Sequence, residues 1–87
     1  MKAVVTVIGK DMVGILAKVS TVCAEANANV IEVTQSVLQE YFAMIMIIDI
    51  TELSCKLDQL QASLDEKVDG MTIHVMHEDI FNSMHKI

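Results

Sequence analysis

Two of the chain's three glycines bracket a short segment whose residue types could bind a small anion. Gly9 and Gly14 can take a positive φ or let another molecule approach the backbone, because they have no Cβ. Asp11, between them, is a good helix N-cap, since its side-chain oxygen can accept a backbone N–H from the first helical turn. The segment therefore predicts exposed helix amides at Gly14 and Ile15, which favour a small anionic group.

Other chemistries need residues that this chain lacks. The spacing of Gly9 and Gly14 matches a Walker loop, but Ile15 and Leu16 stand where lysine and serine or threonine are required. Two histidines, at 74 and 77, would fall on opposite faces of a strand, so they predict no metal site. No nucleophile is followed by a recognisable base and orienting partner. We therefore expect neither an enzyme nor a cofactor.

The charge balance disfavours nucleic acid as a partner. The 6 basic residues are all lysines, the 12 acidic residues bring the net charge to −6, and aromatic residues make up 3% of the chain. Phosphate backbones attract basic faces, and unpaired bases stack on aromatic side chains. The absence of arginine also removes the usual bidentate clamp, so an anion would depend on backbone amides and on Lys10.

Hydropathy disfavours both disorder and a membrane span. The chain is 53% hydrophobic with a mean hydropathy of +0.47, too apolar for a disordered polypeptide. Its most apolar run, residues 42–48, stops at Asp49, well short of the roughly 18 residues of a span. The N-terminus leads directly into strand-like sequence rather than a signal peptide. Cys23 and Cys55 form no CxxC, so we expect a cytoplasmic protein with two packed, reduced thiols.

Hydrophobic periodicity predicts the elements that flank the segment from Gly9 to Gly14, called the loop below. Strands are predicted over residues 2–8, 30–38, 41–50 and 71–77. Helices are predicted over residues 15–26 and 53–66 and, at the C-terminus, 79–86. The first and third strands are apolar on both parities, which is typical of central strands, whereas the second alternates like an edge strand. The expected helix ends are Asn27 for the first helix and a cap at Thr51 or Ser54 for the second.

Gln35 interrupts the alternation of the second strand. Ile31, Val33 and Val37 share its parity, so an amide falls among apolar side chains. One interpretation is a hydrogen-bonded glutamine in the core, and the other is a polar group that faces a pocket or an interface. Both stay open at this point, and Gln35 is a candidate site residue under the second.

The order of elements predicts an α+β fold in a single domain over residues 1–87. Right-handed crossovers make strand, helix, strand, strand, helix, strand a ferredoxin-like βαββαβ sandwich, with a four-stranded antiparallel sheet in the order 4-1-3-2. Both main helices cover one face. The centre of the other face is apolar, so we expect a second subunit or the C-terminal helix to cover it. Ile80, Phe81 and Met84 form the apolar side of that helix.

One spaced motif joins the loop to the second strand: Gly9-x-Asp11-x-x-Gly14-Ile15-Leu16 and, after one helix, Asn29-Val30-Ile31. This motif resembles the signature of ACT domains, and the resemblance covers nearly the whole chain. It is strongest to the stand-alone single-domain ACT proteins of bacteria and archaea, which are similar to the modules of the glycine cleavage system transcriptional repressor. Met12 and Val13 depart from the Arg-Pro pair often found there.

The resemblance implies a regulatory domain that binds an amino acid or similar small metabolite at a subunit interface and signals to a partner protein. It implies that Asp11, Gly14 and the amides around Val13 and Ile15 form one wall of the site. Asn29 of the neighbouring subunit would form the other wall. The expected assembly is a homodimer or a larger homo-oligomer. The alternative is a ligand-free interaction or dimerisation module, in which the loop only packs.

Overall fold

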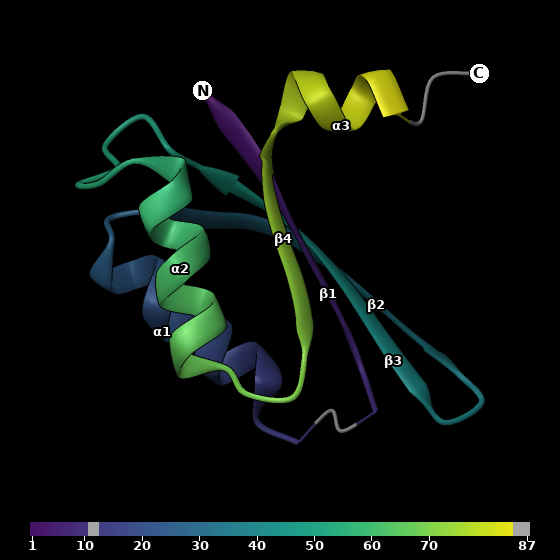
Figure 1. Ribbon diagram of the computed structural model, residues 1–87. Helices are drawn as coiled ribbons and strands as arrows, with labels where there is room; N and C mark the ends of the chain where they lie inside the picture. The colour runs from purple at the N-terminus through teal and green to yellow at the C-terminus, as the bar shows by residue number, and fades with distance from the viewer. Residues whose placement is uncertain (11–12, 85–87) are drawn as a thin grey trace.

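The computed structural model describes residues 1–10 and 13–84, and its elements follow the predicted order (Figure 1). In sequence they are β1 (Lys2–Gly9), α1 (Ile15–Glu25), β2 (Asn29–Leu38), β3 (Tyr41–Asp49), α2 (Leu57–Lys67), β4 (Thr72–His77) and α3 (Glu78–Met84). The predicted α+β fold is confirmed. Among the described residues, no helix is both long enough and apolar enough to cross a bilayer.

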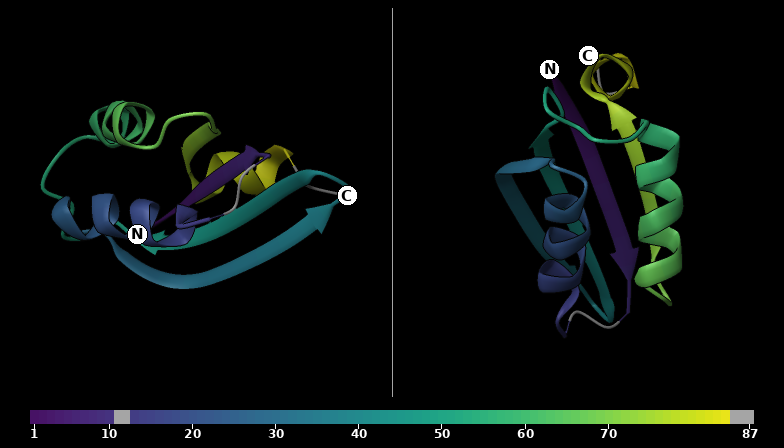
Figure 2. Two further views of the ribbon diagram at one scale, coloured as in Figure 1. Left: turned by 90° about the horizontal axis from the view of Figure 1, so that it is seen from below. Right: turned by 90° about the vertical axis from the view of Figure 1, so that its left-hand side faces the viewer.

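The four strands form one antiparallel sheet in the order β2-β3-β1-β4, as predicted. The two strands that are apolar on both parities, β1 and β3, are the central pair. One row of side chains crosses all four strands, because Val5 lies opposite both Met46 and Val75, and Met46 lies opposite Val33. Helices α1 and α2 lie side by side over one face of the sheet (Figure 2).

The core lies between this face and the two helices. Alternate residues of β1 and β3 point into it, since successive side chains of a strand take opposite faces. Its fully buried members are Val5, Val7, Met44, Met46 and Ile48 from the strands and Val19, Cys23, Leu60 and Leu64 from the helices. The predicted thiols are free: Cys23 is buried and Cys55 is half-buried. Burial raises the pKa of the Cys23 thiol to about 11, so this group stays neutral.

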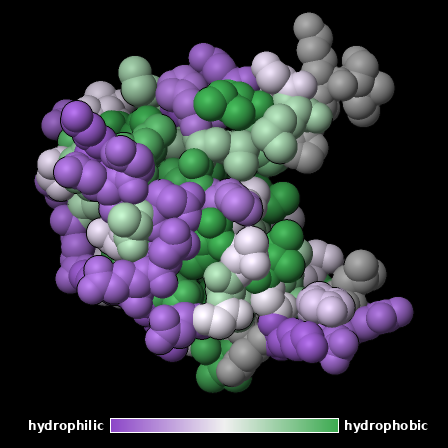
Figure 3. Space-filling model, viewed as in Figure 1, coloured by the Kyte–Doolittle hydropathy of each residue, from purple (hydrophilic) through white to green (hydrophobic). Residues whose placement is uncertain are grey.

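The second face of the sheet is only partly covered. Helix α3 follows β4 directly and contacts β4 and β1, and Val4 on this face is only 3% exposed. Farther along the same face Ile8 is 50% exposed and Ile45 is 40% exposed. The expectation that β1 is buried on both faces was therefore wrong at Ile8. Figure 3 shows apolar side chains along the side of the molecule between α3 and the β2–β3 turn.

The apolar side of α3 is only partly used by the single chain. Phe81 is half-buried, whereas Ile80 is 56% exposed and Met84 is 65% exposed. The helix is short and lies at the end of the sheet where β4 finishes (Figure 1). An exposed apolar row of this kind is typical of a surface that meets another molecule.

Helix α2 begins later than predicted. It starts at Leu57 with Lys56 in the N-cap position, so the predicted start at Leu53 and the predicted caps were wrong. The backbone N–H of Lys56 donates to Oε1 of Gln59 at 2.9 Å, which organises the first turn without a serine or threonine cap. Ser54 is used elsewhere, since its backbone N–H and its hydroxyl both donate to the carbonyl of Ala26, at 2.9 and 3.1 Å.

The register of β2 shifts near its start. A bulge between Val30 and Glu32 leaves Ile31 as the extra residue, without a partner on β3, and its side chain is 49% exposed. The predicted end of α1 at Asn27 is confirmed, since this residue follows the helix with a φ of 61°. Positive φ angles also occur in Gln39, at the β2–β3 turn, and in Gly70, before β4.

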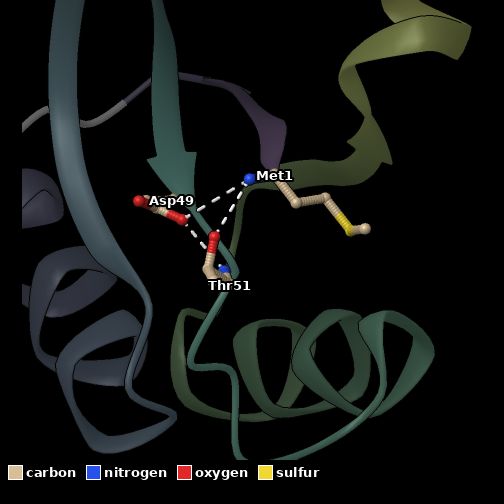
Figure 4. A network of polar contacts seen from close by, with 3 residues as sticks. All are labelled: Met1, Asp49 and Thr51. Carbon is tan, nitrogen blue, oxygen red and sulfur yellow. Dashed lines mark hydrogen bonds and ion pairs between the residues drawn. The ribbon is translucent and has the colours of Figure 1, made fainter.

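A polar network joins the N-terminus to the end of β3 (Figure 4). The Met1 ammonium donates to Oγ1 of Thr51 at 2.9 Å and lies 3.9 Å from Oδ1 of Asp49. The backbone N–H of Thr51 also donates to Oδ1 of Asp49 at 2.9 Å. Hydrogen bonds from Thr51, aided by the ammonium, hold the pKa of the Asp49 carboxyl below its usual value.

Asp49→Asn is expected to reduce thermal stability near neutral pH and to have less effect in acid. A carboxyl whose pKa is lowered by folding stabilises the fold above its unfolded pKa, near 3.8, and that contribution is lost as the pH falls through the folded pKa. Melting curves of both proteins between about pH 7 and pH 2 measure the effect. Glu40→Gln removes the same charge at the β2–β3 turn and serves as the control. A constant difference between Asp49→Asn and the parent across this range would contradict the expectation.

Candidate functional site

Gly9 lies where β1 ends and the loop begins. A Cβ built on this residue would overlap the sulfur of Met71, which packs against the glycine backbone. The φ of Gly9 is not among the positive values, so what this glycine provides here is close packing of Met71 rather than an unusual backbone conformation. Met71, just before β4, was not predicted to touch the loop.

Gly14 occupies the N-cap position of α1 with a φ of 72°, and its carbonyl accepts the backbone N–H of Lys18 at 3.0 Å. Asp11, the predicted cap, lies outside the described residues. Among the residues that are described, no side chain caps α1 and no acidic residue lies in its first turn. This end of the helix carries the partial positive charge of the helix dipole.

The residues beside Gly14 divide between surface and core. Val13 is 78% exposed, whereas Ile15 is 4% exposed and belongs to the core. Any contact of Ile15 with a bound molecule would thus have to come from its backbone N–H. Nζ of Lys10 lies 5.7 Å from the centroid of the Tyr41 ring, so this lysine is near the β2–β3 turn.

Gln35 is exposed on β2, opposite Met44 in the sheet register. The interpretation as a hydrogen-bonded core glutamine was therefore wrong. Val37 follows Gln35 by two positions on β2, so it lies on the same face of the strand and nearer the loop, and it is 59% exposed. Val37, Phe42 and Gly9 lie opposite one another in one row across β2, β3 and β1. Gln35 and Val37 thus lie on the edge strand towards the loop end of the sheet.

Asn29 lies at the start of β2 and is exposed. It lines a shallow hollow of about 310 Å³ beside the end of α1, together with Ala24, Asn27, Ala28 and Glu52. Glu52 brings a carboxylate to this hollow, a feature that the sequence analysis missed because Glu52 lies 23 residues farther along the chain. The hollow is built from amide and carboxylate groups on a small apolar base.

The two predicted walls of the site lie at opposite ends of the sheet. Gly9 is opposite Phe42 on β3, and Asn29 is opposite Asp49 on the same strand. Asp49 lies seven residue positions along β3 from Phe42, a distance of about 23 Å at roughly 3.3 Å per residue. Figure 1 agrees, since β2 begins beside the C-terminal end of α1, far from the β2–β3 turn. A single chain does not bring Asn29 to its own loop.

A separate groove runs between α1 and α2. One part of it, about 370 Å³, is lined by Ala17, Lys18, Thr21, Val22, Glu25 and Lys67. Nζ of Lys67 and Oε1 of Glu25 are 3.2 Å apart across it, and both side chains are exposed. None of the predicted site residues lines this groove, and its ammonium and carboxylate largely satisfy each other.

The histidines of β4 lie as the spacing predicts. His74 is exposed and lies opposite Thr6, whereas His77 lies opposite Ala3, a residue of the helix-covered face. Nδ1 of His77 accepts the backbone N–H of Asp79 at 3.2 Å. Within residues 1–10 and 13–84 there is no group of three His, Cys, Asp or Glu side chains that could hold a metal ion.

Comparison with known proteins identifies the architecture. A family model described as the ACT domain matches residues 2–78. A UPF0237 protein from Clostridium acetobutylicum is 47% identical over the whole of both chains. The solved structure of an ACT domain protein from Streptococcus pneumoniae has a TM-score of 0.80 and 32% identity over 98% of each chain.

A more distant solved structure shares the fold. It is named for a glycine cleavage system transcriptional repressor and matches 85% of this chain and 43% of that one, with a TM-score of 0.67 and 20% identity. The family match, the similar UPF0237 protein and the solved structures together confirm the resemblance to ACT domains inferred from the loop motif.

Proposed function

The chain belongs to the ACT-domain family of regulatory small-molecule-binding modules, and we propose that two copies of it bind an amino acid or similar metabolite between them. Binding would change the contacts that the pair makes with a partner protein. The observation that carries this proposal is the distance of about 23 Å between the loop and Asn29 within one chain. A site that uses both needs two copies.

Pairing through the edge of β2 supplies the geometry. If two copies place their β2 strands antiparallel about a two-fold axis centred on the strand, Asn29 of one copy lies opposite Leu38 of the other. Leu38 is at the end of the sheet from which the loop leads to α1. The start of one β2 thus approaches the loop of the neighbouring copy. A symmetric pair would contain two such sites.

The groups at the two walls suit opposite ends of a free amino acid. The amides at Gly14 and Ile15 favour the carboxylate, through the partial positive charge of the helix N-terminus. The Asn29 side chain and the nearby Glu52 carboxylate favour the ammonium. The exposed Val13 and Val37 would limit the size and polarity of the metabolite's side chain.

The alternative function is dimerisation or protein interaction without a ligand. It is favoured by the exposed apolar residues on the second face of the sheet and on α3, namely Ile8, Ile45, Ile80 and Met84. A dimer formed through that face would not use the β2 edge pairing that brings Asn29 of one copy to the loop of the other. The two assemblies therefore differ in whether Asn29 affects ligand binding.

Asn29→Ala is expected to weaken binding of the metabolite about 10- to 100-fold, the usual cost of losing a hydrogen bond to a charged group. A thermal-shift screen of the free amino acids identifies the ligand, because 100 times its Kd adds about 2.7 kcal/mol to the stability of the folded state. Isothermal titration then compares the parent with the variant. Asn82→Ala makes the same change on α3 and is the control. Parent-like affinity of Asn29→Ala for an identified ligand would contradict the shared site.

A further inference from the structure

The side chain of Gln61 lies against the outer edge of β4 in the way that a neighbouring strand would. Its Nε2 donates to the carbonyl of Ile73 at 2.7 Å, and its Oε1 accepts the backbone N–H of Val75 at 2.7 Å. An edge strand has a row of such unpaired groups, which can pair with another chain. One side-chain amide from α2 thus occupies an acceptor and a donor that an added strand would need.

A third contact fixes which way round this amide lies. Nε2 of Gln61 also donates to Oδ1 of Asp65, one helical turn later, at 3.1 Å. In the reversed orientation, the oxygen of Gln61 would face both the Ile73 carbonyl and the Asp65 carboxylate, and its NH₂ would face the N–H of Val75. Each of those contacts is repulsive, so the observed orientation is strongly favoured. Gln61 is also half-buried, which strengthens its hydrogen bonds.

The opposite edge of the sheet is less protected, although the bulge at Ile31 interrupts the register near the start of β2. Strand β2 pairs with β3 on one side, and its register is regular from Glu32 to the turn. In the described part of the chain, no side-chain hydrogen bond reaches the backbone of β2, and Glu32 is the only charged residue in the strand. A long edge with few charges is typical of a strand that accepts a partner strand.

We propose that Gln61 closes the β4 edge to strand addition and leaves β2 as the chain's one strand-pairing edge, with β2 of a second copy as its partner. If both edges were open, copies could join β2 to β4 head to tail and grow without limit. With β4 closed, pairing ends at two copies. The choice of β2 rests on the proposed function, whereas the closure of β4 rests on the contacts of Gln61 alone.

Gln61→Leu tests the closure, because leucine fills similar space but has no hydrogen-bonding groups. The amide of Val75 is expected to exchange with solvent about tenfold faster in the variant, as its partner is lost. Sedimentation velocity is expected to show species larger than a dimer that grow with concentration. Ala62→Leu adds the same apolar side chain at an exposed site on α2 and removes no hydrogen bond to β4, so it should change neither measurement.

Each remaining outcome has a defined meaning. Unchanged exchange of Val75 in Gln61→Leu would overturn the closure. Faster exchange without larger species would overturn the control of assembly. If Gln61→Leu fails to fold, Gln61→Glu keeps the acceptor for Val75 but cannot donate to Ile73, and the same two measurements apply. A monomeric parent would contradict the two-copy ligand site, while new self-association of the variant alone would still support the closure.

Discussion

Met46→Ala is expected to lower the free energy of unfolding by about 2–5 kcal/mol, the usual cost of truncating a large side chain in a packed core. Met46 is fully buried at the centre of β3 and lies opposite Val5 and Val33 on the two neighbouring strands. A domain of this size is stable by only about 5–15 kcal/mol, so the loss is a large fraction. Urea denaturation of parent and variant measures it.

The neighbouring residue in the strand provides the control. Ile45 points to the second face of the sheet and is 40% exposed, so Ile45→Ala should cost much less stability than Met46→Ala. The comparison keeps the strand and its position in the sheet constant and changes only the face. An equal loss for the two variants at micromolar concentrations would contradict the assignment of the core to the helix-covered face alone.

Gly14→Leu is expected to abolish binding of the metabolite while the domain still folds. Among the described residues other than its two chain neighbours, no atom lies within 4 Å of a Cβ placed on Gly14, so a leucine side chain would extend into open space at the start of α1. The φ of 72° adds a backbone cost of about 1–2 kcal/mol for any residue with a Cβ. Isothermal titration should detect no heat of binding, and a melting curve should still show a cooperative transition.

Gly70→Leu is the matched control for the backbone strain. Gly70 has a φ of 79°, also has no atom within 4 Å of a built Cβ, and lies at the turn before β4 rather than beside β2. It should lose stability as Gly14→Leu does and keep the parent's affinity.

Mixing the Gly14→Leu and Asn29→Ala proteins adds a further test. In a mixed pair, one of the two sites combines the intact loop of the Asn29→Ala copy with the intact Asn29 of the Gly14→Leu copy, so this site should bind the metabolite. Absence of any recovered binding would contradict the shared site.

The sheet could be predicted from the sequence because its pattern follows local physics. A strand that is apolar on both parities must be covered on both faces, and this alone placed β1 and β3 at the centre. The same pattern was misleading at Ile8, because burial on the second face depends on how far α3 reaches. The bulge at Ile31 was also hidden, because Val30 and Ile31 are both apolar and the change of parity at the extra residue does not show in the pattern.

The loop motif was predictable as a motif, but the reasons for its glycines were not. Gly14 takes a positive φ, as expected from its place before a helix. Gly9 allows Met71 to pack directly on its backbone, and Met71 comes from the turn after α2, 62 residues later. The contact of Gln61 with β4 likewise joins two segments whose distance is set only by the packing of α2 on the sheet. Contacts of this kind leave no periodic trace in a sequence.

The order of strands in the sheet has a consequence for the synthesis of the protein. The central strand β1 is made first, yet its two partners are β3 and β4, and β4 follows only after both main helices. At typical rates of translation, roughly 3–13 s separate the end of β1 from the start of β4. During that interval the apolar β1 lacks a neighbour on one side and is open to wrong pairing.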